Sequence, residues 1–163
     1  MLWSISSSAL AQQWYHVELI VFEQLNTNTD EAWPATTFDI DAPLSPSVSG
    51  KLIRPAKNSM LIQTAARLQK SRDYQVLYHQ SWQQPIMTKS YSKAVKIQSR
   101  DGMVTGSVRL FKSTYLHAAL DLQLVQGTES PHLTESRRIR KKKLYFFDHP
   151  KIGALLQITP INP

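Results

Sequence analysis

The chain contains no cysteine, which excludes structural disulfides, iron–sulfur clusters, thiolate zinc sites and thiol catalysis. Its five glycines leave no phosphate-cradling loop, and the Gly-x-Ser-x-Gly turn of serine hydrolases is absent. The five histidines form no His-Glu-x-x-His motif and no i, i+4 pair on the predicted helix. Asp101, Asp121 and Asp148 are scattered singly rather than paired for acid–base catalysis. We therefore expect no enzyme activity, no metal site and no cofactor.

Positive charge is also missing from the first 50 residues, which contain six carboxylates and no lysine or arginine. The net charge of +7 depends instead on residues 137–143, a stretch with six cations, and without them it would be +1. We call this stretch the basic segment. A local cationic surface on a nearly neutral body bears on the partners of a protein rather than on its fold, and it indicates an anionic partner.

No stretch approaches the ~20 consecutive apolar residues that span a bilayer, so we expect no membrane span. Residues 1–11, MLWSISSSALA, are small and mildly apolar and end in Ala-Leu-Ala, a pattern that signal peptidase reads. We interpret them as the remnant of a secretory signal peptide whose basic first part is missing; a disordered tail is the alternative. Residues 12–163 are then expected to form a single α+β domain, because this length and the 42% hydrophobic content suit one core.

The first half of the chain predicts a buried strand, a long loop and a helix. WYHVELIVFEQ at 14–24 is apolar on both faces, which is typical of a central strand. One face consists of Tyr15, Val17, Leu19 and Val21, and the other of Ile20 and Phe22. Residues 25–58 contain four prolines and predict a long irregular loop. An apolar stripe at helical spacing then predicts one principal helix, capped by Asn58 or Ser59.

The second half has the composition of a strand-rich meander. The strand beginning at residue 74 alternates and stops at Pro85, with one predicted face formed by Tyr74, Val76, Tyr78 and Trp82. Strand composition recurs at 94–98, 104–111 and 115–125, with a hairpin turn at Asp101-Gly102. The basic segment is predicted to continue as one strand into Tyr145 and Phe147. The predicted fold class is α+β: an antiparallel sheet of five or more strands with one principal helix packed on a face.

The basic segment carries cations on both faces of its predicted strand. Because buried unpaired charges are costly, this strand should project or lie on a sheet edge. Charge protects an edge from pairing with other chains, but six cations exceed that need. A basic stretch beside aromatic residues suits nucleic acid, yet the RNP1, helix-turn-helix and zinc-finger patterns are absent. Peptidoglycan fits the same residues, since Arg binds the carboxylates of its stem peptides and aromatic rings pack on its sugars.

Four blocks of sequence carry a family resemblance: WYHVELIVFEQ, YQVLYHQSWQQP, GSVRLFKSTYLHAALDL and ESRRIRKKKLYFFDHPKIGALLQITP. In this order, and over most of the chain, they resemble the motif blocks of the CsiV family of periplasmic peptidoglycan-binding cell-shape proteins. The three consecutive lysines at 141–143 make this stretch more basic than we expect for that family. The resemblance implies a non-enzymatic periplasmic protein that binds peptidoglycan. It also implies a role in wall synthesis and cell shape together with LpoA, an outer-membrane lipoprotein activator of a bifunctional penicillin-binding protein.

Two sets of ligand-binding residues follow from the chemistry of the side chains. Stem-peptide carboxylates are expected to bind Arg137, Arg138, Arg140 and Lys141, and glycan is expected to pack on Tyr145 and Trp82. The alternative function is a protein–protein adaptor whose basic strand docks an acidic periplasmic partner. A wall hydrolase ranks third because no catalytic signature is present, and we expect no nucleic-acid ligand.

Overall fold

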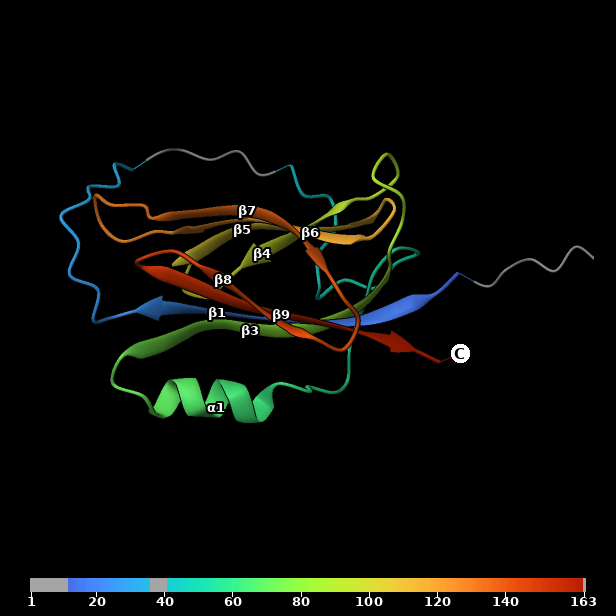
Figure 1. Ribbon diagram of the computed structural model, residues 1–163, viewed down its shortest axis with the longest axis horizontal. Helices are drawn as coiled ribbons and strands as arrows, with labels where there is room; N and C mark the ends of the chain where they lie inside the picture. The colour runs from blue at the N-terminus through green and yellow to red at the C-terminus, as the bar shows by residue number, and fades with distance from the viewer. Residues whose placement is uncertain (1–11, 36–40, 163) are drawn as a thin grey trace, which may run out of the picture.

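The computed structural model describes residues 12–35 and 41–162, so the interpreted signal-peptide remnant at 1–11 lies outside the described residues. The described strands form two antiparallel sheets that face each other, and α1 (Ile62–Lys70) lies on the outer side of one of them (Figure 1). The first sheet has the order β2-β3-β1-β9-β8 and consists of β1 (Trp14–Gln24), β2 (Arg54–Pro55), β3 (Tyr74–Pro85), β8 (Leu144–Asp148) and β9 (Ile152–Ile161). The second has the order β4-β5-β6-β7 and consists of β4 (Ala94–Gln98), β5 (Val104–Lys112), β6 (Leu116–Leu124) and β7 (His132–Ile139). The predicted α+β class is confirmed, and the strands divide between a sheet of five and a sheet of four.

β1 is the central strand of the larger sheet, because it pairs with β3 on one side and with β9 on the other. The face that carries Val17 and Leu19 packs into the main core between the two sheets. The opposite face, with Ile20 and Phe22, packs with Leu61 in a second cluster beneath α1. Both predicted faces of β1 are therefore confirmed. A strand that is apolar on both sides lies in the middle layer of three.

The predicted single face of β3 is wrong. The register of β3 against β1 shifts between Val21 and Phe22, which pair with Tyr78 and Val76 and leave Leu77 as an extra residue. Because a bulge adds one residue to the alternation, the side chains on either side of it point to opposite faces. Tyr78 and Trp82 accordingly join the main core, whereas Tyr74 and Val76 pack with the cluster beneath α1.

The principal helix is confirmed, but its predicted cap is wrong. α1 begins at Ile62, its N-cap residue is Leu61, and no side-chain hydrogen bond caps it from that position. The backbone N–H groups of Met60 and Leu61 donate instead to the carboxylate of Glu18, at 2.6 and 3.1 Å. Among helices of the described ranges, none has the length and apolarity needed to traverse a lipid bilayer.

The long segment from 25 to 58 is irregular over most of its described length, and short contacts tie it to both sheets. β2 pairs with β3 at Gln83 and Trp82. Leu44 lies beside β4: its N–H donates to the carbonyl of Ala94 at 3.3 Å, and its own carbonyl accepts from the N–H of Lys96 at 2.7 Å. The segment therefore covers part of the edge of each sheet.

The basic segment is not one continuous strand, contrary to the sequence prediction. β7 ends at Ile139, the chain turns through Lys141 and Lys142, and β8 begins at Leu144 in the other sheet. Lys142 has a φ of 61°, in the left-handed region that residues other than Gly seldom adopt. Its N–H donates to the carbonyl of Ile158 on β9 at 2.7 Å, which fixes the turn against the five-stranded sheet.

Candidate functional site

The basic segment connects the outermost strands of the two sheets. β7 is an edge strand of the four-stranded sheet, and β8 is an edge strand of the five-stranded sheet. Arg137 and Arg138 lie on β7, opposite Ala118 and His117 of β6. The other cations follow in the connecting turn. The expectation that these charges lie at an edge is therefore met, although they lie at two edges joined by a turn.

Exposure separates the cations into two groups. The side chains of Arg138, Arg140 and Lys141 are exposed, as are those of the two following lysines. Arg137 is half-buried, and its Nε donates to Glu135 Oε1 at 2.7 Å while its guanidinium also pairs with that carboxylate. Arg137 is thus partly neutralised by its neighbour, whereas the exposed cations retain their charge for a ligand.

Aromatic rings hold several of these cations in place. The guanidinium carbon of Arg138 lies 3.3 Å from the ring centre of Tyr115, and that of Arg137 lies 4.3 Å from the ring centre of Phe147. Cation–π contacts of this kind contribute about 0.5–1 kcal/mol each at exposed sites. The two arginines are therefore oriented before any ligand binds, which reduces the entropy that binding must remove.

Lysine side chains of the turn lie over rings at longer range. Lys141 Nζ is 5.6 Å from the ring centre of Tyr15, and Lys143 Nζ is 5.4 Å from that of Tyr145. The hydroxyl of Tyr145 accepts the backbone N–H of Arg140 at 2.8 Å. Tyr145 is half-buried, so its hydroxyl supports the turn while part of its ring stays accessible beside the cations.

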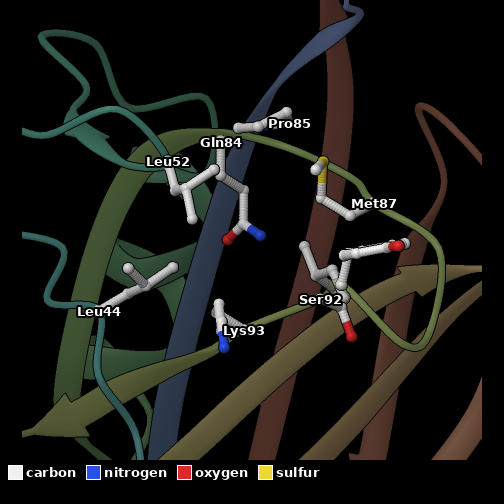
Figure 2. Close-up of a pocket in the computed structure, with 9 residues that line it drawn as sticks. Leu44, Leu52, Gln84, Pro85, Met87, Ser92 and Lys93 are labelled. Carbon is white, nitrogen blue, oxygen red and sulfur yellow. The ribbon is translucent and has the colours of Figure 1, made fainter.

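Trp82 does not lie near the other predicted site residues. Its side chain is 0% exposed, belongs to the core between the sheets, and donates its indole N–H to Gln84 Oε1 at 2.6 Å. Gln84 in turn lines a cavity with Leu44 and Met87 (Figure 2). This cavity has a volume of about 10 Å³, roughly that of one water molecule, and cannot hold a sugar ring. Trp82 is therefore not part of the surface that we propose below.

A buried carboxylate cluster beneath α1 was missed by the sequence analysis. Glu18 is 1% exposed, and it accepts hydrogen bonds from the Ser59 hydroxyl and from the two N–H groups that precede α1. His79 Nε2 lies 2.7 Å from Glu18 Oε1, and His16 Nε2 lies 3.4 Å from Glu18 Oε2. Burial alone would raise the pKa of Glu18, but the hydrogen bonds from Ser59, His79 and the backbone outweigh it and hold the pKa below its ordinary value. A charged residue in a strand that is apolar on both faces was the available signal, because such a charge needs partners.

The histidines serve as hydrogen-bonding and packing residues in the described structure. His117 stacks on the ring of Phe111 at a centroid distance of 5.1 Å. His149 Nδ1 accepts the backbone N–H of Lys151 at 3.2 Å in the turn between β8 and β9. Burial lowers the pKa of His149, with Glu31 and Asp148 acting against it. Within residues 12–35 and 41–162, no group of three His, Asp or Glu side chains is placed to hold a metal ion.

An α+β protein with exposed, aromatic-supported cations along joined sheet edges is suited to binding anionic ligands. The chain belongs to the CsiV family: the family model described as "Peptidoglycan-binding protein, CsiV" matches residues 1–161. Comparisons with curated proteins and with solved structures returned no match. The family assignment confirms the resemblance seen in the sequence. It makes this chain a member of a peptidoglycan-binding family and relates it to the cell envelope.

Proposed function

We propose that the basic segment is the surface that binds peptidoglycan, through the carboxylates of the stem peptides. The observation that carries this proposal is the set of exposed cations at the joined edges of β7 and β8, some of them oriented by aromatic rings. An Arg guanidinium donates two parallel hydrogen bonds to a carboxylate, and such bonds are about twice as strong as neutral ones. Arg138 and Arg140 are the principal ligand-binding residues in this proposal, because both are exposed and neither has a carboxylate partner in the described part of the chain.

Lys141, Arg137 and Tyr145, which were also predicted, take supporting roles in this proposal. Lys141 adds charge beside the two arginines, and Arg137 contributes less because Glu135 already pairs with it. Tyr145 offers the accessible part of its ring to a sugar, while its hydroxyl stays bonded to the backbone of Arg140. The surface thus combines carboxylate recognition with one apolar ring, as a polymer of sugars and acidic peptides requires.

The wider role that we propose rests on family membership and on the sequence resemblance. The protein is non-enzymatic and periplasmic, and residues 1–11 belong to the signal that directs its export. It promotes cell-wall synthesis and maintains cell shape together with an LpoA-type lipoprotein activator of a bifunctional penicillin-binding protein. Residues 12–163 act as a single domain in this role.

A protein–protein adaptor is the second candidate, and the edge positions of β7 and β8 favour it. An edge strand offers unpaired backbone groups to another chain, and the adjoining cations would attract an acidic partner. Such docking depends steeply on salt and has a defined stoichiometry. Titration of the purified LpoA-type activator at low salt tests it, and the absence of a complex there contradicts it.

Co-sedimentation with purified sacculi tests the main proposal. The variant is Arg138→Glu with Arg140→Glu, and the control is Lys57→Glu with Arg72→Glu, which reverses the same number of charges at exposed residues. We expect the first variant to bind at least about tenfold more weakly at physiological salt, since loss of two charge-assisted contacts removes more than about 1.4 kcal/mol. The control should pellet with sacculi like the parent protein. Equal retention of both variants would remove the basic segment as the site.

A further inference from the structure

A polar groove lies at the other pair of sheet edges, between β3 and β4. Two adjoining hollows of about 330 and 340 Å³ make up this groove, and they share five lining residues: Tyr78, Gln80, Gln98, Ser99 and Arg100. β2 pairs with β3 only at Gln83 and Trp82, so the part of β3 that lines the groove lies beyond this pairing. β4 is the other edge strand of the four-stranded sheet, opposite β7. We call this feature the β3–β4 groove.

The groove lies away from the basic segment. β4 and β7 are the two outer strands of the four-stranded sheet, and β8 is the outer strand of the larger sheet on the side away from β3. A ligand group bound by the exposed arginines therefore does not occupy the groove. The groove and the basic segment are therefore two separate candidate binding surfaces, at opposite edges of the sheets.

The polar side chains of the groove are mainly amides, hydroxyls and cations, together with His79 and the carboxylate of Asp101. Gln98, Arg100 and Lys96 are exposed, and none of their side chains has a hydrogen-bond or salt-bridge partner among the residues that the structure describes. Ser45 and Ser47 close one end. Donors and acceptors of this kind match the hydroxyl and acetamido groups of amino sugars, which hydrogen-bond in several directions at once.

Hydrogen bonds within the protein fix the walls of the groove before a ligand arrives. The hydroxyl of Tyr78 donates to Gln80 Oε1 at 3.0 Å, which leaves both amide hydrogens of Gln80 for a ligand. On the opposite wall, Ser99 Oγ donates to Asp101 Oδ1 at 2.5 Å and accepts the N–H of Val104 at 2.9 Å. Groups held in this way lose little freedom on binding, so their hydrogen bonds contribute more to affinity.

We propose that the β3–β4 groove binds the glycan strand of peptidoglycan, with Gln80, Gln98 and Arg100 donating to sugar oxygens. This inference rests on the proposed function, because it adds a second point of contact with the same polymer. The two surfaces divide the ligand by chemistry: sugars bind in the groove, and carboxylates of the stem peptides bind at the basic segment.

Two soluble probes separate the surfaces. One is the uncharged tetrasaccharide of N-acetylglucosamine, which carries no carboxylate for the basic segment, and the other is an isolated stem peptide without sugar. Each probe is titrated by calorimetry into the full chain and into two double variants. The groove variant combines Gln98→Ala and Arg100→Ala. The basic-segment variant combines Arg138→Ala and Arg140→Ala. These side chains are exposed, so the variants should keep the parent melting temperature to within about 4 °C, which allows for the lost contact between Arg138 and Tyr115.

The groove variant should bind the tetrasaccharide at least about tenfold more weakly and bind the stem peptide unchanged. The basic-segment variant should show the opposite pattern. A tetrasaccharide that does not bind the parent protein, or that binds the groove variant with parent affinity, overturns the groove assignment. Failure of the proposed function has a different signature: the stem peptide and whole sacculi then bind the basic-segment variant with parent affinity.

Discussion

Replacement of the buried carboxylate in β1, Glu18→Gln, should destabilise the protein by weakening the attachment of α1 to the five-stranded sheet. Glu18 lies where β1 passes beneath the start of α1, and its two oxygens accept from two backbone N–H groups, from Ser59 and from His79. No residue within α1 is buried, whereas Leu61 just before the helix is buried. The carboxylate is therefore the main polar attachment of the helix to the sheet.

The magnitude follows from the number of donors that one carboxylate satisfies. A glutamine amide has one accepting oxygen, and its NH₂ group would face at least one of the present donors. A buried donor left without a partner costs about 1–3 kcal/mol, and the hydrogen bonds to Met60 N, Leu61 N and His79 all change at once. We expect a loss of about 3 kcal/mol in the free energy of unfolding. For a chain of this size that corresponds to roughly 6–12 °C in the melting temperature.

The effect should depend on pH in a defined direction. The pKa of Glu18 in the folded protein lies below its ordinary value of 4.5, so the folded state favours the ionised form. Its stabilising contribution is complete above that ordinary value and is lost as the pH falls through the lower folded value. Glu18→Gln should therefore differ most from the parent protein at neutral pH, and the two should converge as the pH falls below 4.5.

Urea unfolding at pH 7 and at several acidic values measures both quantities. Asp30→Asn is the matched control, because it removes an exposed carboxylate that has no hydrogen bond in the described structure. Hydrogen exchange of the α1 amides should also accelerate in Glu18→Gln. A loss below about 1 kcal/mol at pH 7, or a difference from the parent protein that stays constant with pH, would refute the reasoning.

Two further substitutions test the packing. In Gly153→Ala the new Cβ would lie 2.4 Å from Phe22 Cζ and 3.0 Å from Phe146 Cε2. We therefore expect thermal unfolding to show a destabilisation of about 1–3 kcal/mol. An unchanged melting temperature would contradict the predicted clash. Trp82→Phe leaves the buried Gln84 oxygen without its donor and opens a void, which should cost about 2–4 kcal/mol in urea unfolding. The folded Trp82→Phe protein should be retained on sacculi as well as the parent protein is. A loss of retention without unfolding would show that Trp82 contributes to wall binding.

Most strands of this fold could be predicted from the sequence, but β9, the short β2 and the division of the strands into two sheets were not predicted. Period-two alternation placed both faces of β1 correctly, since residues on each face are apolar. The bulge at Leu77 gave no signal, because Leu77 is itself apolar and the alternation stays plausible on either side of it. The turn at Lys142 was hidden as well: its left-handed φ usually marks Gly or Asn, and here a lysine adopts it.

The candidate sites were predictable to the extent that they are local in sequence. Six cations in seven residues identified the basic segment and its edge position without any structure. Trp82 was assigned to the ligand from its chemistry, although its place in an alternating strand pointed to the core where it lies. The β3–β4 groove has no sequence signature, because its residues come from β3, β4, the turn after β4 and the segment at 45–47, which only the folded chain brings together.

The positions of the two proposed surfaces restrict the ligands that can use both. The basic segment joins the edges formed by β7 and β8, whereas the groove lies between β3 and β4 on the other side of the sheets. We expect a disaccharide carrying one stem peptide to occupy one surface at a time, because the two surfaces lie at opposite edges of the sheets. A cross-linked polymer extends around the protein and can occupy both, so the second contact forms at a high effective concentration. We therefore expect the protein to prefer intact wall over its soluble fragments, without high affinity at either proposed surface.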